Sequence, residues 1–316
     1  MSSSSPHPAV LVILGPTASG KSGLALAVAR KTGGEIISAD SRQIYRELDI
    51  GAAKPSPDAL LEIRHHFIDE KNIGEPFTAG YFAIEALKRI EDIRRRGKKA
   101  IIAGGSTLYL QGLLTGFSDL PEADPAIRKK LLEELDRFGR DNLYERLLER
   151  DPEQAATLDP TKTHRLIRSL EIIEITGKSV TELRTKDKRQ GSGLCFCTLG
   201  LSMPREILYE RINHRTEKML DAGLLYEAEK LYKKYQLLLE SGRIQALQSV
   251  GYQELFQYLE GKIDLTTAVS LIKQHTRNYA KRQLTFFNNS MDVRWETAPE
   301  NDNGIEKLAD RLAGMI

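Results

Sequence analysis

The chain has 316 residues, of which 41% are hydrophobic and 28% are charged, a composition that supports a sizeable buried core in two lobes. Its net charge of +2 is too small to indicate nucleic-acid binding by itself. No apolar run approaches the length of a membrane span, and residues 1–8 are a polar lead without an apolar core, so we expect a cytoplasmic protein with no membrane partner.

Short strand-like runs alternate with helical patterns along the chain. The runs comprise residues 10–14, 35–39, 66–68, 100–103, 194–200 and 292–295, the last as an edge strand. Strands separated by helices favour parallel pairing. The pattern therefore predicts an α/β fold with a mostly parallel sheet flanked by helices.

Two helical blocks interrupt this alternation. Residues 124–138, 142–150 and 162–176 have the pattern of charged amphipathic helices with no strand between them. Residues 204–289 form a second block with apolar residues at helical spacing. We expect a core domain of residues 1–117 and 195–316, which includes the block 204–289, and a helical insertion domain of residues 118–194.

The most specific motif is a glycine-rich loop after the first predicted strand. It matches the pattern G-x-x-x-x-G-K-[ST] with the residues Gly15, Pro16, Thr17, Ala18, Ser19, Gly20, Lys21 and Ser22. The backbone N–H groups of such a loop attract phosphate, Lys21 adds a positive charge, and the Ser22 hydroxyl can ligate Mg²⁺. The motif predicts a polyphosphate site and leaves open which polyphosphate binds and what chemistry follows.

Two more turns follow predicted strands at the edge of the sheet where this loop lies. For Asp40, after the second strand, three roles are open: a general base, a magnesium ligand or a helix N-cap. Gly104 and Gly105 follow the fourth strand and let a ligand approach the backbone. Ser106 or Thr107 either donates to a phosphate or caps the next helix. The fourth strand lacks the terminal acid of a Walker B motif, which disfavours an ATP-hydrolysing motor.

Basic side chains recur at helical spacing in two places. Lys273, Arg277 and Lys281 follow one another at four-residue steps, with Arg282 beside them. Residues 163–168 carry a similar cluster. Each cluster suits either a phosphate backbone or a solvated helix face, and the sequence alone does not separate the two.

The histidine and cysteine pairs have simpler interpretations. His65 and His66 are adjacent and diverge, so we expect local structural contacts and not a metal site. Cys195 and Cys197 lie two apart on a predicted strand, where they point to opposite faces and cannot bridge each other. We expect both cysteines to be core residues, because free cysteine is usually buried.

Taken in order, these motifs resemble the tRNA dimethylallyltransferases. The similar segments span nearly the whole chain and comprise residues 15–22, 38–45, 49–55, 65–69, 104–109, 250–252 and 279–285. The resemblance implies a fold like that of P-loop NTPases, with a phosphate loop that holds dimethylallyl diphosphate in place of ATP. It implies transfer of the dimethylallyl group to the exocyclic N6 amine of the adenine 3′ of the anticodon, in tRNAs reading codons that begin with U.

The resemblance assigns catalytic roles to residues noted above. An aryl amine is a poor nucleophile, so Asp40 is expected to act as the general base. Lys21, together with Mg²⁺ held through Ser22, is expected to stabilise the leaving diphosphate, which Arg215 also reaches. Ser106 stands where the family usually has threonine, keeps the hydroxyl, and takes over its catalytic and substrate-binding role.

The resemblance also implies a tRNA anticodon stem-loop as partner, with the target adenine extruded into a protein channel. The residues that it places at the RNA are Asp40, Ser41, Arg42, Gln43, Ser106, Arg128, His164, Arg165, Arg168, Lys281 and Arg282. The helical insertion is expected to help grip the tRNA. We expect the protein to be a monomer.

Two other functions are compatible with the phosphate loop. A P-loop small-molecule or nucleotide kinase would share the fold, the loop and the magnesium, and it is the main alternative. A nucleotide-dependent switch that binds a partner without turnover is a third hypothesis. It leaves the combination of Asp40 with a basic helix unexplained, and the chain has no N-K-x-D guanine signature.

Overall fold

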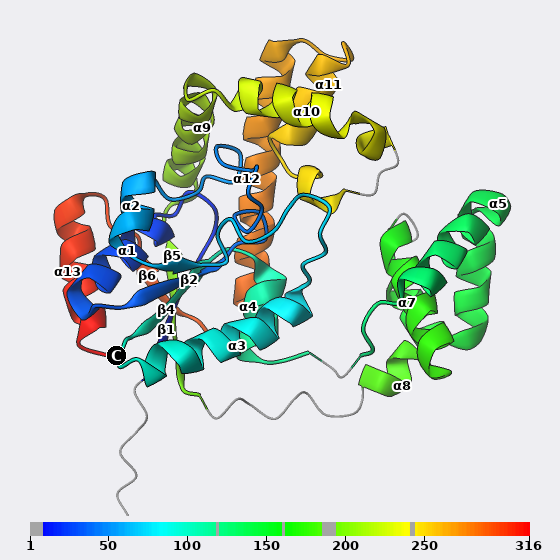
Figure 1. The fold of residues 1–316 in the computed structure, drawn as a ribbon, viewed down its shortest axis with the longest axis horizontal. Coiled ribbons are helices and arrows are strands. Elements are labelled where there is room, and N and C mark those ends of the chain that lie inside the picture. Colours follow the sequence, from blue (N-terminus) through cyan, green and yellow to red (C-terminus); the bar gives the residue numbers. More distant parts are fainter. Residues whose placement is uncertain (1–8, 118–119, 160–161, 185–193, 241–243) are drawn as a thin grey trace, which may run out of the picture. The chain divides into compact units, whose positions relative to one another are not determined.

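The computed structural model describes residues 9–117, 120–159, 162–184, 194–240 and 244–316. The chain divides into two compact units, one formed by Met1–Leu114 with Ser192–Ile316 and the other by Thr115–Gly191. In the described part of the chain, all six strands belong to the larger unit and the smaller unit is helical (Figure 1).

Six strands form the centre of the larger unit in the order β3-β2-β4-β1-β5-β6. They are β1 (Val10–Leu14), β2 (Glu35–Ala39), β3 (His65–His66), β4 (Ala100–Gly104), β5 (Phe196–Ser202) and β6 (Arg294–Thr297). All neighbouring strands pair in parallel, so their carboxyl ends meet at one edge of the sheet. The predicted α/β fold with a parallel sheet flanked by helices is confirmed.

The observed bounds of several strands differ from the predicted ones. β3 stops at His66 because Phe67 and Asp69 have φ angles of 62° and 58°, in the left-handed region that leaves the extended path. β5 and β6 both begin and end later than predicted. β6 pairs only with β5 among the described strands, which makes it the edge strand that was expected.

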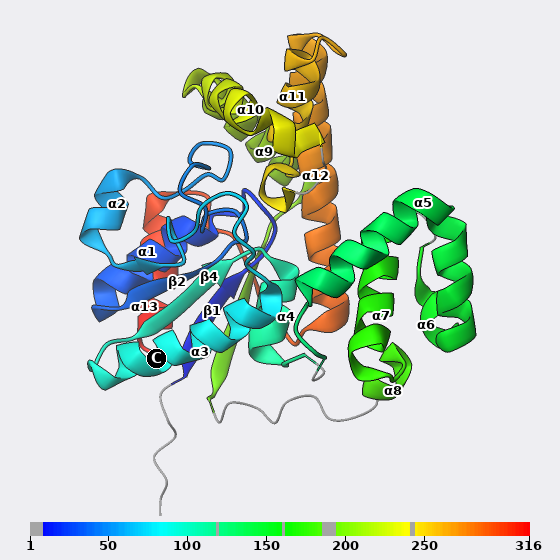
Figure 2. The same ribbon diagram turned by 45° about the vertical axis from the view of Figure 1, so that its right-hand side comes forward.

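Helices cover both faces of the sheet, as Figure 2 shows. On one face lie α1 (Lys21–Thr32) and α13 (Asp302–Ala313), and on the other lie α3 (Ala79–Arg95) and α4 (Thr107–Leu114). The residues of β1 alternate between the two cores: Leu11 and Ile13 join the first, and Val12 and Leu14 join the second. β1 is therefore apolar along its whole length.

The remaining helices of the larger unit lie outside these two layers, and most of them form the block drawn at the top of Figure 2. They are α2 (Pro57–Glu62), α9 (Arg205–Asp221), α10 (Leu224–Glu240), the 3₁₀-helix Gln245–Leu247, α11 (Tyr252–Leu259) and α12 (Leu265–Ser290). Asp264 begins α12 by accepting a hydrogen bond from the N–H of Thr267 at 2.7 Å. α12 contacts α4, α9 and α11, so it links the helical block to the sheet.

The smaller unit has its own apolar core. It comprises α5 (Pro125–Arg150), α6 (Pro152–Thr157), α7 (Thr163–Thr176) and α8 (Val180–Arg184). α5 is kinked at Gly139, which has a φ of 81°, so the two predicted helices 124–138 and 142–150 meet there. Leu131, Leu147 and Leu170 are at most 1% exposed and form the centre of this core.

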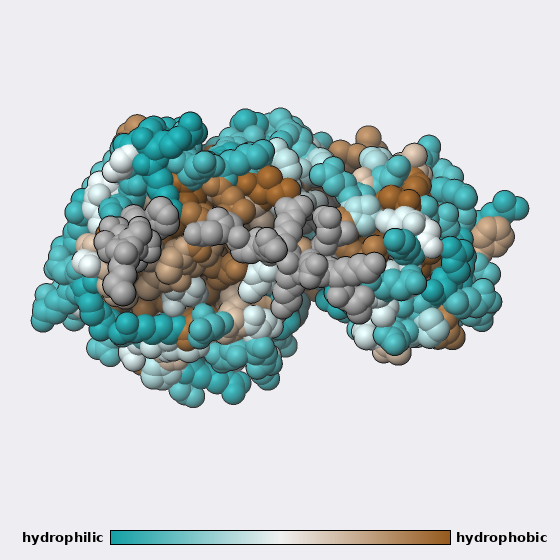
Figure 3. All heavy atoms as spheres, turned by 90° about the horizontal axis from the view of Figure 1, so that it is seen from below, coloured by the Kyte–Doolittle hydropathy of each residue, from teal (hydrophilic) through white to brown (hydrophobic). Residues whose placement is uncertain are grey.

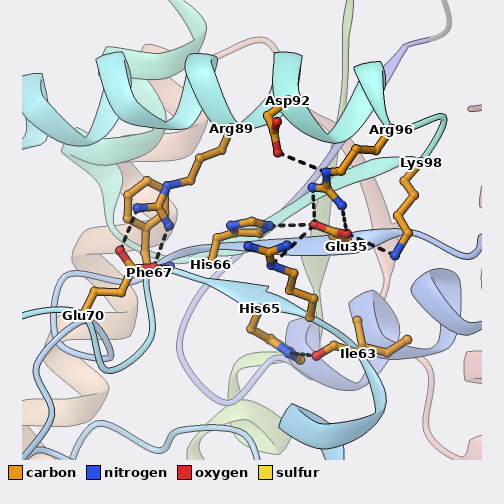
Figure 4. A network of polar contacts seen from close by, with 11 residues as sticks. Glu35, Ile63, His65, His66, Phe67, Glu70, Arg89, Asp92, Arg96 and Lys98 are labelled. Carbon is orange, nitrogen blue, oxygen red and sulfur yellow. Dashed lines mark hydrogen bonds and ion pairs between the residues drawn. The ribbon is translucent and has the colours of Figure 1, made fainter.

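A charged network ties β2 to its neighbours at the amino end of the strand (Figure 4). Glu35 is 1% exposed, and its carboxylate accepts hydrogen bonds from Arg96 and from His66 and contacts Lys98 at 3.1 Å. The bond from Arg96 and those from His66 and Lys98 together lower the pKa of Glu35. His65 bonds the carbonyl of Ile63, so both histidines make structural contacts at this end of the sheet.

In the face drawn in Figure 3, hydrophilic residues dominate the rim of the larger unit and hydrophobic residues gather nearer its middle. In the described residues no helix is long and apolar enough to cross a membrane.

Cys197 packs partly against the core, but the prediction of a core position was wrong for Cys195. Cys195 precedes β5, where its carbonyl pairs with Val10 while its side chain stays exposed.

Candidate active site

The phosphate loop, residues 15–22, connects β1 to α1 at the carboxyl edge of the sheet. Gly15 has a φ of 146°, and a Cβ atom there would lie 2.7 Å from the carbonyl oxygen of Leu201. Gly20 and Ala18 also have positive φ angles, of 92° and 64°. These turns place Lys21 at the first position of α1, where the helix N-terminus favours anions.

Lys21 and Arg215 bring two positive groups to this loop. The Nζ atom of Lys21 donates to the carbonyl of Pro16 at 2.6 Å and lies 3.5 Å from Ser19 Oγ. Burial lowers the pKa of Lys21 to about 7, the nearby Arg215 lowers it as well, and Asp40 acts against both. Arg215, from α9, reaches Thr17 Oγ1 at 3.5 Å. A bound polyanion would relieve the repulsion between the two cations.

Asp40 follows β2 and forms a local turn. Its Oδ1 atom accepts a hydrogen bond from the N–H of Arg42 at 2.9 Å, a bond from aspartate to the backbone two residues on. No helix begins there, since the next one is α2 at Pro57, so the N-cap alternative for Asp40 is wrong. The carboxylate lines the cavity that also contains the phosphate loop.

Ser106 joins the turns that follow β4 and β2. Its Oγ atom accepts a hydrogen bond from the N–H of Ser41 at 2.9 Å, and its own N–H donates to the carbonyl of Ala39 at 3.1 Å. Gly104 permits this approach, because a Cβ atom there would lie 2.2 Å from the Ala39 oxygen. The Ser106 hydroxyl therefore supports the turn at Asp40, while its carbonyl accepts from the N–H of Leu110 at the start of α4.

One cavity of about 410 Å³ collects most of the predicted catalytic and phosphate-binding residues. Its walls come from the phosphate loop, the turns after β2 and β4, α9 and α12. The lining residues include Thr17, Ala18, Gly20, Lys21, Ser22, Asp40, Gln43, Gly104, Gly105, Arg211, Arg215, Tyr279 and Gln283. A cationic phosphate cradle and a carboxylate thus share one space, which suits the displacement of a phosphate leaving group by a proton-bearing nucleophile.

Comparisons with known proteins agree with this arrangement. The family model described as IPP transferase matches residues 43–290. The chain is 67% identical over 308 residues to a tRNA dimethylallyltransferase of Pelodictyon phaeoclathratiforme, covering 97% of each chain. The chain belongs to the IPP transferase family.

Solved structures of similar proteins extend the agreement to the fold. A tRNA isopentenylpyrophosphate transferase of Staphylococcus epidermidis is 37% identical, with a TM-score of 0.67 and 98% of each chain covered. A eukaryotic dimethylallyltransferase acting on tRNA is 30% identical, with a TM-score of 0.82, 97% of this chain and 78% of that chain covered. The sheet of this family member is therefore of the P-loop NTPase type, and the resemblance drawn from the motifs is confirmed.

Gln283 is a residue of the transferase site to which the sequence analysis gave no role. It is 2% exposed on α12. Its Oε1 atom accepts from the N–H of Thr17 at 2.9 Å, and its Nε2 atom donates to the carbonyl of Gly105 at 2.8 Å. The sequence offered one indication of this role: Gln283 is a polar residue at helical spacing from Ala280 and Phe287, on the buried face of α12. Gln283 holds the phosphate loop against the turn after β4.

Gln43 has structural partners as well as a place in the cavity wall. Its Oε1 atom accepts from Ser38 Oγ at 2.8 Å, and its Nε2 atom donates to the carbonyls of Ala53 and Ala52 at 3.1 and 3.4 Å. Gln43 thus closes the loop between β2 and α2, residues 40–56, on itself. We call this segment the β2–α2 loop.

The predicted RNA-binding residues lie on both units. In the larger unit, Lys281 and Arg282 are exposed on α12. The rest of the basic stripe is partly occupied, since Lys273 contacts Glu217 at 2.6 Å and Arg277 donates to Asn213 at 2.8 Å, both on α9. The exposed end of the stripe is thus its carboxyl-terminal end, where Arg282 lies over the ring of Tyr279 at 5.9 Å.

The smaller unit carries the other four. His164 and Arg165 are exposed at the start of α7. Arg128 and Arg168 each approach Glu171 Oε2 at 2.7 Å, and Glu171 is fully buried. This carboxylate fixes two guanidinium groups from α5 and α7 beside each other.

Proposed function

We propose that this protein transfers the dimethylallyl group of dimethylallyl diphosphate to the N6 amine of the adenine 3′ of the anticodon in tRNA. The observation that carries the proposal is that Asp40 and the phosphate loop line one cavity in a member of the IPP transferase family. The kinase alternative is not favoured, because the matching relatives are tRNA dimethylallyltransferases over nearly their whole length.

The donor side of the reaction involves charge growing on the leaving diphosphate. The bond from C1 of the dimethylallyl group to the diphosphate oxygen breaks as the bond from N6 to C1 forms. Lys21 and Arg215 line the cavity and would supply positive charge to that oxygen, and the backbone of the phosphate loop would add N–H donors. Because burial lowers the pKa of Lys21 to about 7, a bound polyanion would restore a charge that burial disfavours.

The acceptor side requires that N6 lose a proton. Asp40 lines the cavity and keeps one oxygen in the bond from Arg42, which leaves the second oxygen to accept the proton. Ser106, through its bond to Ser41, holds this turn at the edge of β4. We propose that Asp40 is the general base and that Ser106 positions it.

Oxygen donors for Mg²⁺ are present in the same cavity. Mg²⁺ prefers carboxylate, hydroxyl and phosphate oxygens, and the Ser22 hydroxyl and the Asp40 carboxylate both line the cavity. The residues therefore fit the ion, and Ser22 would hold it together with diphosphate oxygens. When bound, Mg²⁺ supplies further neutralisation of the leaving group.

The RNA contacts are proposed from exposure and charge. Arg42 lies two residues after Asp40 and is partly exposed, Lys281 and Arg282 are exposed on α12, and His164 and Arg165 are exposed on α7. The lysine and arginine side chains neutralise phosphates and bind the backbone without reading sequence. Burial and the neighbouring Arg165 lower the pKa of His164, so its ring is available as a neutral hydrogen-bonding group. We propose that these side chains bind the anticodon stem-loop.

The test uses labelled dimethylallyl diphosphate, Mg²⁺ and an unmodified anticodon stem-loop RNA. The expected result is one label per RNA, and none in an otherwise identical RNA that carries hypoxanthine in place of the target adenine, because hypoxanthine has an oxygen where adenine has N6. Label in both RNAs would place the transfer at another atom. Absence of label, together with ATP-dependent phosphorylation of a small acceptor, would favour the kinase.

A further inference from the structure

Glu227, on α10, makes an unusual set of contacts with the β2–α2 loop. Its carboxylate accepts three consecutive backbone N–H groups, those of Asp49, Ile50 and Gly51, at 3.1, 2.8 and 2.9 Å. The hydroxyl of Tyr252, the first residue of α11, donates to the same carboxylate at 2.6 Å. Consecutive N–H groups of this kind form a concave anion site, and here a side chain of the chain itself occupies it.

Packing reinforces these hydrogen bonds. Tyr252 is fully buried, and its ring lies against the backbone of Gly51, where a Cβ atom would be 2.4 Å from Cζ and Oη. A residue with a side chain at position 51 would therefore displace the tyrosine. The loop is therefore held at Gly51 by the carboxylate of Glu227 and the phenol of Tyr252, and only glycine leaves room for the tyrosine ring.

Residues 49–51, which Glu227 holds, lead directly into the cavity wall. Ala52 and Ala53, the next two residues, line the cavity, and their carbonyls accept from Gln43, which lines it too. Gln43 bonds Ser38 at the end of β2, two residues before Asp40. Glu227 and Tyr252 are not among the described residues that line the cavity. They contact the cavity wall through the β2–α2 loop.

We propose that Glu227 and Tyr252 are positioning residues for the transfer reaction: they hold residues 49–53 so that Gln43 and the turn at Asp40 keep the geometry needed by the acceptor. This inference rests on the proposed function. The inference separates the acceptor side of the reaction from the donor side. Gln283 holds the phosphate loop, whereas Glu227 bonds the β2–α2 loop. We call the contacts of Glu227 and Tyr252 with residues 49–51 the latch. Loss of the latch is expected to slow the transfer and to leave diphosphate binding intact.

The test compares Tyr252→Phe and Glu227→Gln with the wild-type chain. Tyr252→Phe removes one hydroxyl and keeps the ring against Gly51, so the fold should persist. We expect kcat for transfer to fall about tenfold, since small misplacements of reacting groups are costly, while the Kd for inorganic diphosphate with Mg²⁺ stays within about twofold. Glu227→Gln should show the same split.

The matched control is Tyr235→Phe. Tyr235 lies on the same helix as Glu227 and donates its hydroxyl to a carboxylate of the same loop, that of Glu47, at 2.5 Å. It touches a side chain and not the backbone 49–51, so kcat and diphosphate affinity should both remain within about twofold. A tenfold fall in kcat for this control would show that any weakening of the loop suffices, and the specific latch would be rejected.

A double-mutant cycle with Gln43→Ala separates positioning from general destabilisation. If the latch acts through Gln43, Tyr252→Phe should lower kcat by less than about twofold once Gln43 is truncated. An unchanged tenfold effect in that background, a parallel loss of diphosphate binding, or wild-type kcat in Tyr252→Phe would each overturn the inference. Failure of the wild-type chain to transfer any dimethylallyl group would instead reject the proposed function and the inference with it.

Discussion

The phosphate loop and the β2–α2 loop line the same cavity but are held in place by different contacts. The phosphate loop takes its shape from residues within it, chiefly Gly15 and Gly20 with their positive φ angles. The β2–α2 loop is irregular and depends on partners far along the chain, including Glu227 and Tyr252. The turns that bind the anion are thus set locally and have Gln283 as a distant support, whereas the acceptor side depends on several distant partners.

The largest effect that tests this division is expected from Asp40→Asn. The amide keeps the size of the side chain and removes its basicity, so transfer should fall about a thousandfold. Diphosphate affinity should change by less than about threefold, because the phosphate loop is untouched. Single-turnover transfer and equilibrium binding of diphosphate measure the two. A comparable loss of diphosphate affinity would mean that Asp40 serves the donor side as well.

Lys21→Met is expected to have the next largest effect, on the donor side of the reaction. Removing a charged hydrogen-bond donor should weaken diphosphate binding about 30-fold. Binding of the RNA alone should be unaffected. Lys281→Met, on the exposed face of α12, is the matched control and should give the reverse pattern. If both variants weaken RNA binding equally, the two ligands do not use separate residues.

Gln283→Ala tests how much the phosphate loop depends on a contact from outside its own motif. The substitution leaves the N–H of Thr17 and the carbonyl of Gly105 without their partner, which should lower the free energy of unfolding by about 2 kcal/mol. Gln274→Ala, at an exposed position of α12, should change it by less than about 0.5 kcal/mol. Urea unfolding measures both. Equal values would show that Gln283 adds little to the loop.

The smallest expected effect is a difference in the number of protons taken up when diphosphate binds. Burial lowers the pKa of Lys21 to about 7, so at pH 8 the amine of the empty site is mostly neutral. Bound diphosphate favours the charged form, and the wild-type protein should take up close to one more proton than Lys21→Met at pH 8, with the difference vanishing near pH 6. Calorimetry in buffers of different ionisation enthalpy gives this number. Equal uptake by the two proteins would mean that Lys21 is already charged in the empty site.

The parts of the molecule that could be predicted from sequence are those set by local pattern. Most strand runs were recognisable because they are rich in apolar residues, and the phosphate loop was recognisable because its glycines have a fixed spacing. The early end of β3 was not predictable, because it depends on the positive φ of Phe67. The N-cap alternative for Asp40 failed because the side chain bonds its own turn.

The contacts missed by the sequence analysis join residues that are distant in the chain. Gln283 lies 266 positions after Thr17 and 178 after Gly105. Glu227 lies 176 positions after Gly51. No spacing rule connects such residues, and each looks in sequence like an ordinary polar residue of a helix. Their roles follow only from the packing of α10 and α12 on the loops.

The position of Gln283 on α12 has a consequence for fragments of the protein. As the chain is synthesised, every residue of the phosphate loop is complete long before α12 has been made. A truncated product that ends before α12 would contain the whole motif, yet the N–H of Thr17 and the carbonyl of Gly105 would still lack the side chain that bonds both. Screening fragments or gene products for the motif alone would therefore count polypeptides in which the diphosphate cradle is unfinished.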